Sequence, residues 1–230
     1  MALLVRSWNL FHGNTDPPTR RSHLREMVEL AVADGPDVVC LQEIPVWAVP
    51  ALERWSGLRA FPAVARPGLR PHSLAGWITR LDNGLLRSAI AGQANAILVD
   101  RSCDAADLGL VRVSERGVEP RVAQAVRVAG IVVANVHVSS IDRAPQLAGG
   151  ELERTQAFAE AAAHGGPVVV AGDFNLVARG LDGYSEPGPG IDQVIARGVP
   201  CSPLVIWQCE RRMQNGLVLS DHAPVEARIG

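Results

Sequence analysis

Residues 36–43 read Pro-Asp-Val-Val-Cys-Leu-Gln-Glu, and they carry the clearest fold signal in the chain. Residues 37–41 form a mostly apolar run with two adjacent valines, which is typical of a buried strand. This run ends directly in Gln42 and Glu43. A buried strand tolerates such polar groups only where something uses them, so the end of this strand is a candidate functional position.

The same arrangement, an apolar strand that contains or borders acids, amides or histidine, recurs four times along the chain. The polar groups are Asn9, Asn135-Val136-His137, Gly172-Asp173-Phe174-Asn175 and Ser220-Asp221-His222. In α/β architectures the C-terminal ends of strands commonly line the ligand crevice. Asp173 and Asn175 are two residues apart, so in an extended chain both project to one side and Phe174 projects to the other.

The carboxylates and amides in these segments predict a particular kind of metal site. Glu43, Asp173 and Asp221, together with two amides, make a hard, oxygen-rich ligand set. Such a set suits Mg²⁺ or Mn²⁺ rather than zinc. Each segment alone is weak evidence, because single polar residues at strand ends are more often caps, turns or solvated loop residues.

The hydrophobic pattern predicts many short strands and only two strong helices. The expected strands are residues 3–10, 37–41, 94–99, 108–113, 123–128, 131–138, 168–171, 193–196, 204–207 and 225–229. Residues 20–33 and 151–164 have the spacing of helices, and a weaker helix at 49–55 is followed by a long expected loop as far as residue 74. This order lacks regular βαβ alternation. Two sheets packed face to face with helices outside would fit it, although the topology stays open.

Composition excludes several chemistries. All 22 basic residues are arginine, so a P-loop lysine, a Schiff-base lysine and a lysine base are excluded. The four cysteines show no Cys-x-x-Cys pair and no zinc spacing, and a disulfide between Cys201 and Cys209 stays open. The net charge of −2 disfavours binding nucleic acid through bulk charge, although a local basic groove would still allow it.

The length and the first residues set expectations for organisation. The 230 residues show no linker or repeat, so residues 1–230 are expected to form a single domain. The apolar run before Arg6 is too short for a signal peptide, and no later segment approaches a membrane span. A cytoplasmic protein with no implied protein partner is the expectation.

Taken together and in order, the motifs resemble those of the endonuclease/exonuclease/phosphatase superfamily. The matching pieces span nearly the whole chain: Trp8-Asn9, residues 36–43, Asn95-Ala96-Ile97-Leu98, Asn135-Val136-His137-Val138, Gly172-Asp173-Phe174-Asn175, residues 191–195 and residues 220–225. The resemblance implies an α/β fold, a four-layer α/β sandwich with two central mixed β-sheets flanked by helices, as in deoxyribonuclease I. It also implies a Mg²⁺-dependent phosphoesterase, with Mn²⁺ as a substitute ion.

The resemblance assigns a role to each oxygen ligand. It implies that Glu43 binds the metal and that Asn9 and Asp221 lie at the metal side of the site. It implies that Asp173 orients or deprotonates the attacking water. Asn175 is expected to hold that nucleophile or a phosphoryl oxygen.

Two histidines complete the implied site. His137 is expected to hydrogen-bond the phosphate. His222 is expected to contact the phosphate and to pass a proton, with Asp192 fixing the orientation of its ring. Metal and donor groups around the phosphoryl oxygens are what a transition state of phosphate transfer needs.

The substrate stays open at this stage. Hydrolysis of a phosphodiester in nucleic acid is the first hypothesis. A groove that binds the backbone phosphates would be lined by arginines, for which the candidates are Arg66, Arg70, Arg80, Arg87, Arg116 and Arg121. Arg121, which precedes an apolar strand, is the first of these to test by mutation. The alternative is a phosphatase or phosphodiesterase for a small molecule or lipid headgroup. A non-catalytic binding module on the same fold is disfavoured because Glu43, Asp173, Asn175 and His222 are all present. A serine hydrolase built on Ser139 or Ser220 lacks the Gly-x-Ser-x-Gly elbow.

Overall fold

The computed structural model describes residues 2–68, 91–140 and 145–230. Its first sheet has the strand order β11-β14-β1-β3-β5-β4. The strands of this sheet are β1 (Leu3–Asn9), β3 (Val38–Ile44), β4 (Arg59–Arg66), β5 (Gln93–Val99), β11 (Val205–Ile206) and β14 (Val225–Ile229). β1 and β3 are parallel, and the other pairs are antiparallel, so the sheet is mixed.

The second sheet has the order β10-β9-β8-β7-β6. Its strands are β6 (Ala105–Arg112), β7 (Val122–Val128), β8 (Ile131–His137), β9 (Val168–Asp173) and β10 (Asp192–Arg197). Only β8 and β9 run parallel. A small third sheet joins β12 (Met213–Gln214), β13 (Leu217–Leu219) and β2 (Thr15–Asp16).

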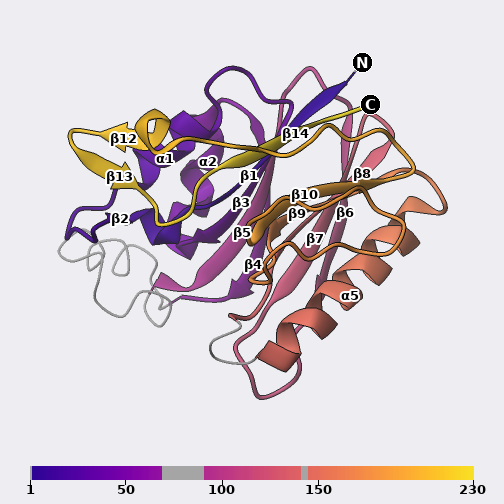
Figure 1. Ribbon diagram of the computed structural model, residues 1–230. Coiled ribbons are helices and arrows are strands. Elements are labelled where there is room, and N and C mark those ends of the chain that lie inside the picture. The colour runs from indigo at the N-terminus through magenta and orange to yellow at the C-terminus, as the bar shows by residue number, and fades with distance from the viewer. Residues whose placement is uncertain (1, 69–90, 141–144) are drawn as a thin grey trace.

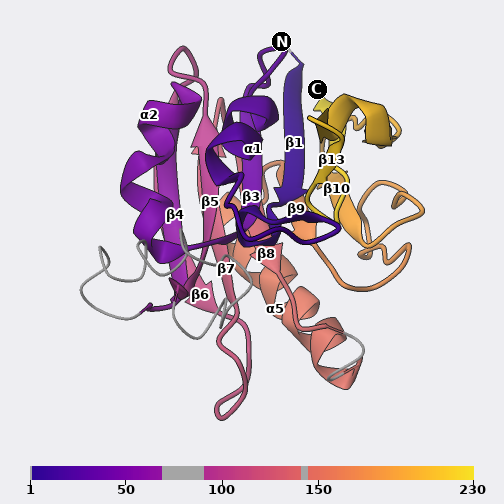
Figure 2. The same ribbon diagram turned by 90° about the vertical axis from the view of Figure 1, so that its left-hand side faces the viewer.

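Helices cover the outer faces of both large sheets, as Figures 1 and 2 show. α1 (Leu24–Ala31) and α2 (Leu52–Ser56) pack on the first sheet, and α5 (Pro145–Ala163) packs on the second. Short 3₁₀ turns occur at η1 (Phe11–Gly13), η2 (Val46–Ala51) and η3 (Cys209–Arg212). The expected four-layer α/β sandwich is therefore confirmed.

Apolar side chains fill each of the three spaces between the layers. One cluster, which includes Val5, Ile97 and Val169, lies between the two sheets. A second cluster joins the first sheet to α1, whose buried positions Leu24, Met27, Val28 and Ala31 have the spacing of one helix face. The third cluster joins the second sheet to α5 and contains Phe174. Phe174 therefore faces the core, as the alternation around Asp173 predicts.

Buried amides connect the two sheets near the C-terminal ends of β3 and β8. Gln42 Nε2 donates to Asn135 Oδ1 at 2.8 Å, and Asn135 Nδ2 donates to the carbonyls of Leu41 and Ala96 at 3.0 Å. Both amide side chains are fully buried. Their polarity within apolar strands is thus explained by these bonds between the sheets, which hold the strand ends that follow in fixed positions.

Most expected elements are present, but the expectation for the segment after residue 55 was wrong. Residues 59–66 were assigned to a loop, and they form β4, an edge strand of the first sheet. Its weak periodicity reflects an edge strand with one half-exposed face, and Pro62 is tolerated there. Residues 69–74 of the same expected loop lie outside the described residues.

Two smaller expectations are also settled. All four cysteines are free, so Cys201 and Cys209 do not form a disulfide. α5 begins at Pro145, six residues before the expected start at residue 151. The first turns were not predicted because Gly149 and Gly150 weaken the helical pattern of the sequence.

In the described part of the chain no helix combines the length and the apolar character needed to cross a membrane.

Candidate active site

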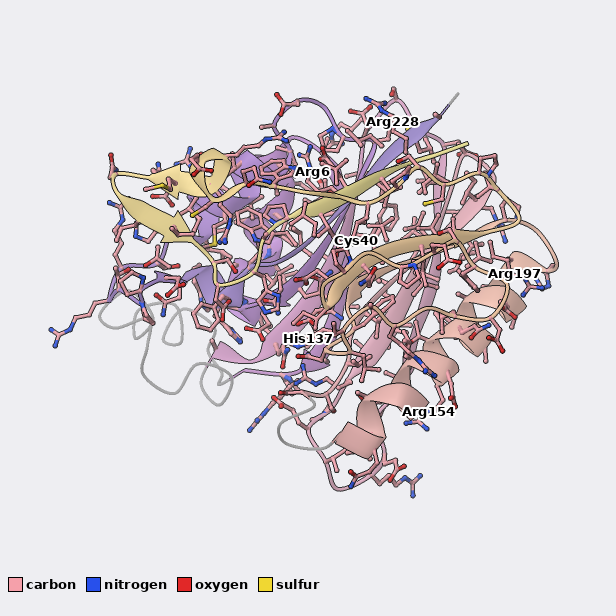
Figure 3. The ribbon with its side chains drawn as sticks, viewed as in Figure 1. Arg6, Cys40, His137, Arg154, Arg197 and Arg228 are labelled. Carbon is pink, nitrogen blue, oxygen red and sulfur yellow. The ribbon has the colours of Figure 1, made fainter. Side chains whose placement is uncertain are left out.

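Side chains from both sheets surround one polar pocket of about 350 Å³. The parallel pairs β1–β3 and β8–β9 all end on this side of the sandwich, and Figure 3 shows His137 here, away from Arg228 near the termini. The residues that line the pocket are Phe11, His12, Glu43, Gln93, Glu119, Arg121, His137, Ser140, Asp173, Asn175 and His222. Acids, imidazoles and one guanidinium thus meet in a volume that fits a phosphate group.

Glu43 presents an open carboxylate because a β-bulge turns it into the pocket. The pairing of β3 with β5 shifts register between Leu41 and Ile44, and Glu43 adopts a left-handed backbone with φ of 54°. About a fifth of its side chain, 21%, is exposed. Its Oε2 lies 3.6 Å from His12 Nε2 and its Oε1 lies 3.8 Å from His137 Nε2. These separations are too long for hydrogen bonds, so both oxygens can accept a cation.

Asp173 lies at the floor of the pocket and is held on both oxygens. Asn9 Nδ2 donates to Oδ2 at 3.0 Å, and the backbone N–H of Asn175 donates to Oδ1 at 2.9 Å. The carboxylate is 1% exposed. Only a glycine fits at position 172, directly before Asp173, because a Cβ there would lie 1.9 Å from the carbonyl oxygen of Val136 on the neighbouring strand. This close approach explains the glycine in the Gly-Asp-Phe-Asn segment.

Two acids face each other across neighbouring strands. Asp173 at the end of β9 pairs in register with Asp192 at the start of β10. Burial, followed by the negative charge of Asp192, raises the pKa of Asp173 above its usual range, while His222 and Asn9 act in the opposite direction. A carboxylate with a raised pKa is a more effective proton acceptor than an ordinary aspartate. The expected water-activating residue is therefore electrostatically suited to that task.

His222 forms a hydrogen-bonded pair with Asp192. The Nδ1–Oδ2 distance is 2.8 Å, and Nε2 on the other side of the ring lies 3.9 Å from Asp173 Oδ2. Burial disfavours the imidazolium, but the hydrogen bond and charge of Asp192, with the charges of Asp173 and Asp221, raise the pKa of His222 to about 10. His222 is therefore a cation at neutral pH, with Nε2–H directed at the pocket.

The turn that carries His222 is tied to the end of β1. Ser220 Oγ donates to the carbonyl of Asn9 at 2.7 Å and accepts the backbone N–H of His222 at 3.1 Å. Trp8 Nε1 donates to the carbonyl of His222 at 2.9 Å. The Ser-Asp-His and Trp-Asn segments, more than 200 residues apart in the chain, therefore position each other.

The tautomer of His137 is set by a neighbouring arginine. Arg121 Nη1 lies 3.0 Å and Gln93 Nε2 lies 2.9 Å from His137 Nδ1. A guanidinium can only donate, so Nδ1 accepts and the ring hydrogen is on Nε2. Burial and then the charge of Arg121 lower the pKa of His137 well below its usual range. His137 is a neutral donor, and its Nε2 lies 3.5 Å from Asp173 Oδ2.

Strained backbone is concentrated around the pocket. Among the described non-glycine residues, four of the ten with positive φ line it: Phe11 (47°), His12 (53°), Glu43 (54°) and Asn175 (49°). Each such residue costs of order 1–3 kcal/mol, which persists only when surrounding contacts enforce it. This strain directs side chains into the pocket that regular strands would turn elsewhere.

Five of the eight predicted site residues line this pocket: Glu43, His137, Asp173, Asn175 and His222. Asn9 lies behind Asp173 and Asp192 lies behind His222, each in hydrogen-bond contact with it. Asp221 is exposed and lines an adjoining hollow with Asp192 and His222. The structure thus brings the predicted residues into one region but sets Asp221 at its edge.

Of the six arginines proposed for a basic groove, Arg121 lines the pocket, with Nη2 3.2 Å from Glu119. Arg66 and Arg116 do not line it. Arg70, Arg80 and Arg87 lie outside the described residues.

His12 and Gln93 were missed by sequence reasoning, although both line the pocket. His12 is the third residue after Asn9, which was a usable signal. Gln93 is a polar residue at the start of an apolar strand, the same kind of signal that identified the other segments.

The donor chemistry of the pocket fits a divalent metal ion. Among the described residues no hydrogen bond occupies either carboxylate oxygen of Glu43, and Asp173 lines the same pocket. Asp173, Asp192 and His222 also have potential ligand atoms within 4.8 Å of one another. In that second group, however, Asp192 Oδ2 is bonded to His222 Nδ1, and the protonated ring of His222 has no lone pair for an ion. Glu43 is therefore the better centre for an ion.

A two-sheet α/β sandwich with acids and histidines gathered at its strand ends defines a phosphoesterase-type architecture. The chain belongs to the endonuclease/exonuclease/phosphatase family, whose model matches residues 7–222. This family comprises metal-dependent hydrolases of phosphate esters. No functionally curated protein matches the chain by sequence.

Solved structures of very different sequence share the fold. Humanized TDP2 from D. rerio superposes with a TM-score of 0.70 at 16% identity, covering 100% of this chain and 99% of that one. Truncated TDP2 from Caenorhabditis elegans gives 0.67 at 17% identity, with 100% and 97% covered. A mannosyl-6-phosphatase from Bacteroides thetaiotaomicron gives 0.64 at 15% identity, with 99% of each chain covered. At these identities the likeness supports the fold alone.

Proposed function

We propose that this protein hydrolyses a phosphate ester with the help of Mg²⁺, for which Mn²⁺ substitutes, and that residues 1–230 act as one catalytic domain. One observation carries the proposal. An open carboxylate (Glu43), a buried carboxylate with a raised pKa (Asp173) and an imidazolium (His222) surround the same small polar pocket. These are the groups needed for metal binding, water activation and charge stabilisation.

Asp173 acts on the attacking water. Its Oδ2 is held by Asn9 and faces both His137 and His222, so the carboxylate cannot rotate away from the pocket. It accepts the proton of water as the water attacks phosphorus. Asn175, whose Nδ2 donates to the carbonyl of Val138 at 3.1 Å, keeps the wall of the pocket beside Asp173 in place and offers its oxygen to the water.

The two histidines act on the phosphoryl oxygens. His137 donates the hydrogen on Nε2 to a non-bridging oxygen, because Arg121 occupies its Nδ1. His222 approaches with Nε2–H as a cation, stabilises the developing negative charge and passes its proton toward the leaving oxygen. Asp192 keeps His222 oriented, and it keeps the imidazole protonated until that transfer. Electrostatic stabilisation of this kind is commonly the largest single contribution to such catalysis.

Glu43 would hold the metal ion, with Asn9 and Asp221 on the same side of the site. A divalent ion bound there supplies Lewis-acid polarisation of the phosphoryl oxygens. Asn9 Oδ1 already accepts the backbone N–H of Phe11 at 3.0 Å, which leaves one lone pair of that oxygen for the ion.

A phosphodiester in nucleic acid is the first substrate that we propose. Arg121 supports it, because this residue is 7% exposed, lines the pocket and has a buried Nε without a hydrogen-bond partner among the described residues. A small-molecule or lipid-headgroup phosphate is the second candidate. The charge balance favours that candidate, since Glu119 pairs with Arg121 and the chain carries a net charge of −2.

A substrate panel tests this proposal. Purified protein with Mg²⁺ or Mn²⁺ would be assayed on single- and double-stranded DNA, RNA, a sugar phosphate, an inositol phosphate, sphingomyelin and bis-nitrophenyl phosphate. Turnover of at least one ester that EDTA abolishes and metal restores is the expected result. The variant Asp173→Asn, assayed beside wild type, should be inactive on the same ester. Full activity in EDTA, or in Asp173→Asn, would refute the assigned chemistry.

A further inference from the structure

Arg121 is anchored at the pocket by its own backbone. Its N–H donates to Ser114 Oγ at 3.0 Å, and its carbonyl accepts the N–H of Val113 at 2.9 Å. Val113 and Ser114 are both buried, so this pairing closes the loop between β6 and β7 immediately before β7 begins. Glu119 is carried by the same closed loop, two residues before Arg121, and it also lines the pocket. The loop therefore holds the two charged side chains next to each other.

The guanidinium of Arg121 uses its hydrogen-bond donors unequally. Nη1 lies 3.0 Å from His137 Nδ1, and Nη2 lies 3.2 Å from Glu119 Oε2. Nε is buried and has no hydrogen-bond partner among the described residues. Nε–H and one N–H of Nη2 point the same way along one edge of the planar group, and such an edge matches two oxygens of a carboxylate or phosphate. Glu119 therefore satisfies only half of this edge.

The contact between Arg121 and Glu119 is weak enough for a better ligand to replace it. Its length of 3.2 Å exceeds the separation of about 2.7–2.9 Å that is typical of charge-assisted bonds. The side chain of Glu119 is 28% exposed, whereas that of Arg121 is 8% exposed. Release of Glu119 thus returns its carboxylate to water but leaves a buried guanidinium edge that needs an anion. A phosphate that accepts from both Nε and Nη2 satisfies that edge more fully than Glu119 does.

The ring of His137 separates this edge from the catalytic acid. Arg121 contacts Nδ1 of the ring, while Nε2 on the other side lies 3.5 Å from Asp173 Oδ2. In the proposed mechanism the phosphate that is attacked lies beside Nε2 and Asp173. An anion on the edge of Arg121 is therefore a different group of the same substrate, one imidazole ring away from the scissile phosphate.

We propose that the Nε–Nη2 edge of Arg121 binds a second phosphate of the substrate, and that Glu119 is a specificity-determining residue because it competes with that phosphate. This inference rests on the proposed binding of the scissile phosphate beside His137. Glu119 lowers the affinity for substrates with two phosphates and has little effect on substrates with one. The second phosphate is the neighbouring phosphodiester of a nucleic acid strand or a further phosphate of a small molecule.

Binding of two inert phosphonates tests the inference without turnover. Propylphosphonate has one phosphonate group and propane-1,3-bisphosphonate has two, and neither contains an ester bond. Calorimetric titration in Mg²⁺ would give the affinity of each for wild type, Glu119→Gln, Arg121→Gln and the double variant. Glu115→Gln is the matched control, since Glu115 is an exposed carboxylate of the same loop that does not line the pocket. Thermal unfolding would check that each variant is folded.

The expected result separates the two phosphonates. Glu119→Gln should tighten binding of the bisphosphonate by about fivefold or more and change that of propylphosphonate by less than about twofold. Arg121→Gln should remove the preference for the bisphosphonate, and Glu119→Gln should have no effect in that background. Equal tightening of both phosphonates, or of neither, would overturn the role of Glu119. Failure of propylphosphonate to bind wild type would instead refute the proposed phosphate site.

Catalytic assays identify the source of the second phosphate. Wild type and Glu119→Gln would be compared on a single-stranded oligonucleotide and on an inositol bisphosphate. The substrate whose second phosphate reaches Arg121 should show a lower KM in Glu119→Gln with little change in kcat, because Glu119 does not contact the scissile phosphate. An unchanged KM on every ester that the protein hydrolyses would contradict the inference.

Discussion

His222 Nδ1 lies 2.8 Å from Asp192 Oδ2, although the two residues are 30 positions apart in the chain. Asp192 starts β10, where its neighbours are buried, and it is itself 8% exposed. A buried carboxylate without a partner is costly, so His222 offsets the cost of placing Asp192 there. The same contact keeps the ring of His222 charged and turned toward Asp173.

Asp192→Asn should lower single-turnover rates by about 10²- to 10⁴-fold with little change in substrate affinity, because ring geometry survives but the counter-charge is lost. His222→Ala should be at least as severe. The double variant should fall far short of the product of the two single effects, since the residues act as a unit. Multiplicative effects, or a nearly wild-type Asp192→Asn, would show that the pair does not contribute to catalysis.

The pH dependence of kcat/KM should be bell-shaped. The base must be deprotonated, so the rate should rise with pH through the pKa of Asp173, which burial and Asp192 raise above its ordinary value. The acid must be protonated, so the rate should fall as pH passes about 10, the pKa of His222. In Asp192→Asn both limbs should move to lower pH, because the negative charge that raises both pKa values is gone. An unmoved alkaline limb would exclude His222 as the acid.

Glu43→Gln should raise the Mg²⁺ concentration needed for half-maximal activity while leaving the fold intact. The amide keeps the shape of the side chain but removes the charge that attracts the ion. Glu53→Gln is a suitable control, since Glu53 is an exposed carboxylate on α2 that does not line the pocket. Equal Mg²⁺ requirements for wild type and Glu43→Gln would remove Glu43 from the metal site.

Arg121→Ala should distinguish the two substrate classes. If the substrate is nucleic acid, loss of one phosphate contact should reduce the slope of log affinity against log salt by about one unit. Arg228→Ala, at the opposite end of the molecule, should leave that slope unchanged (Figure 3). Loss of the donor to His137 should also lower turnover of any ester, so an altered rate with an unaltered salt slope would favour a small phosphate ester.

Gly172→Ala should destabilise the protein by about 2–4 kcal/mol, because the added Cβ would collide with the carbonyl oxygen of Val136 across the β8–β9 pair. Gly149→Ala in α5 is the matched control. A Cβ there meets nothing within 4 Å, so this change should stabilise the helix by about 0.5–1 kcal/mol. Chemical denaturation of the two variants would measure both free energies. Equal stabilities would contradict the close approach of the strands.

Local patterns in the sequence were sufficient to predict most strands of the fold and most residues of the site. Apolar runs predicted nearly all strands of the two sheets, since burial imposes its own periodicity on each strand. Polar residues at the ends of those runs identified Glu43, His137, Asp173 and His222, which all line one pocket. These features depend on residues next to one another in the chain, and so the sequence by itself was sufficient.

Tertiary structure decided the features that depend on distant partners. The bulge that turns Glu43 into the pocket arises from the pairing of β3 with β5. The donor that fixes the tautomer of His137 is Arg121, which directly precedes β7. β4 became recognisable only as an edge strand of an existing sheet. Bulges, ring tautomers and edge pairing are set by hydrogen bonds between strands remote in sequence, and local periodicity contains no record of which groups will meet.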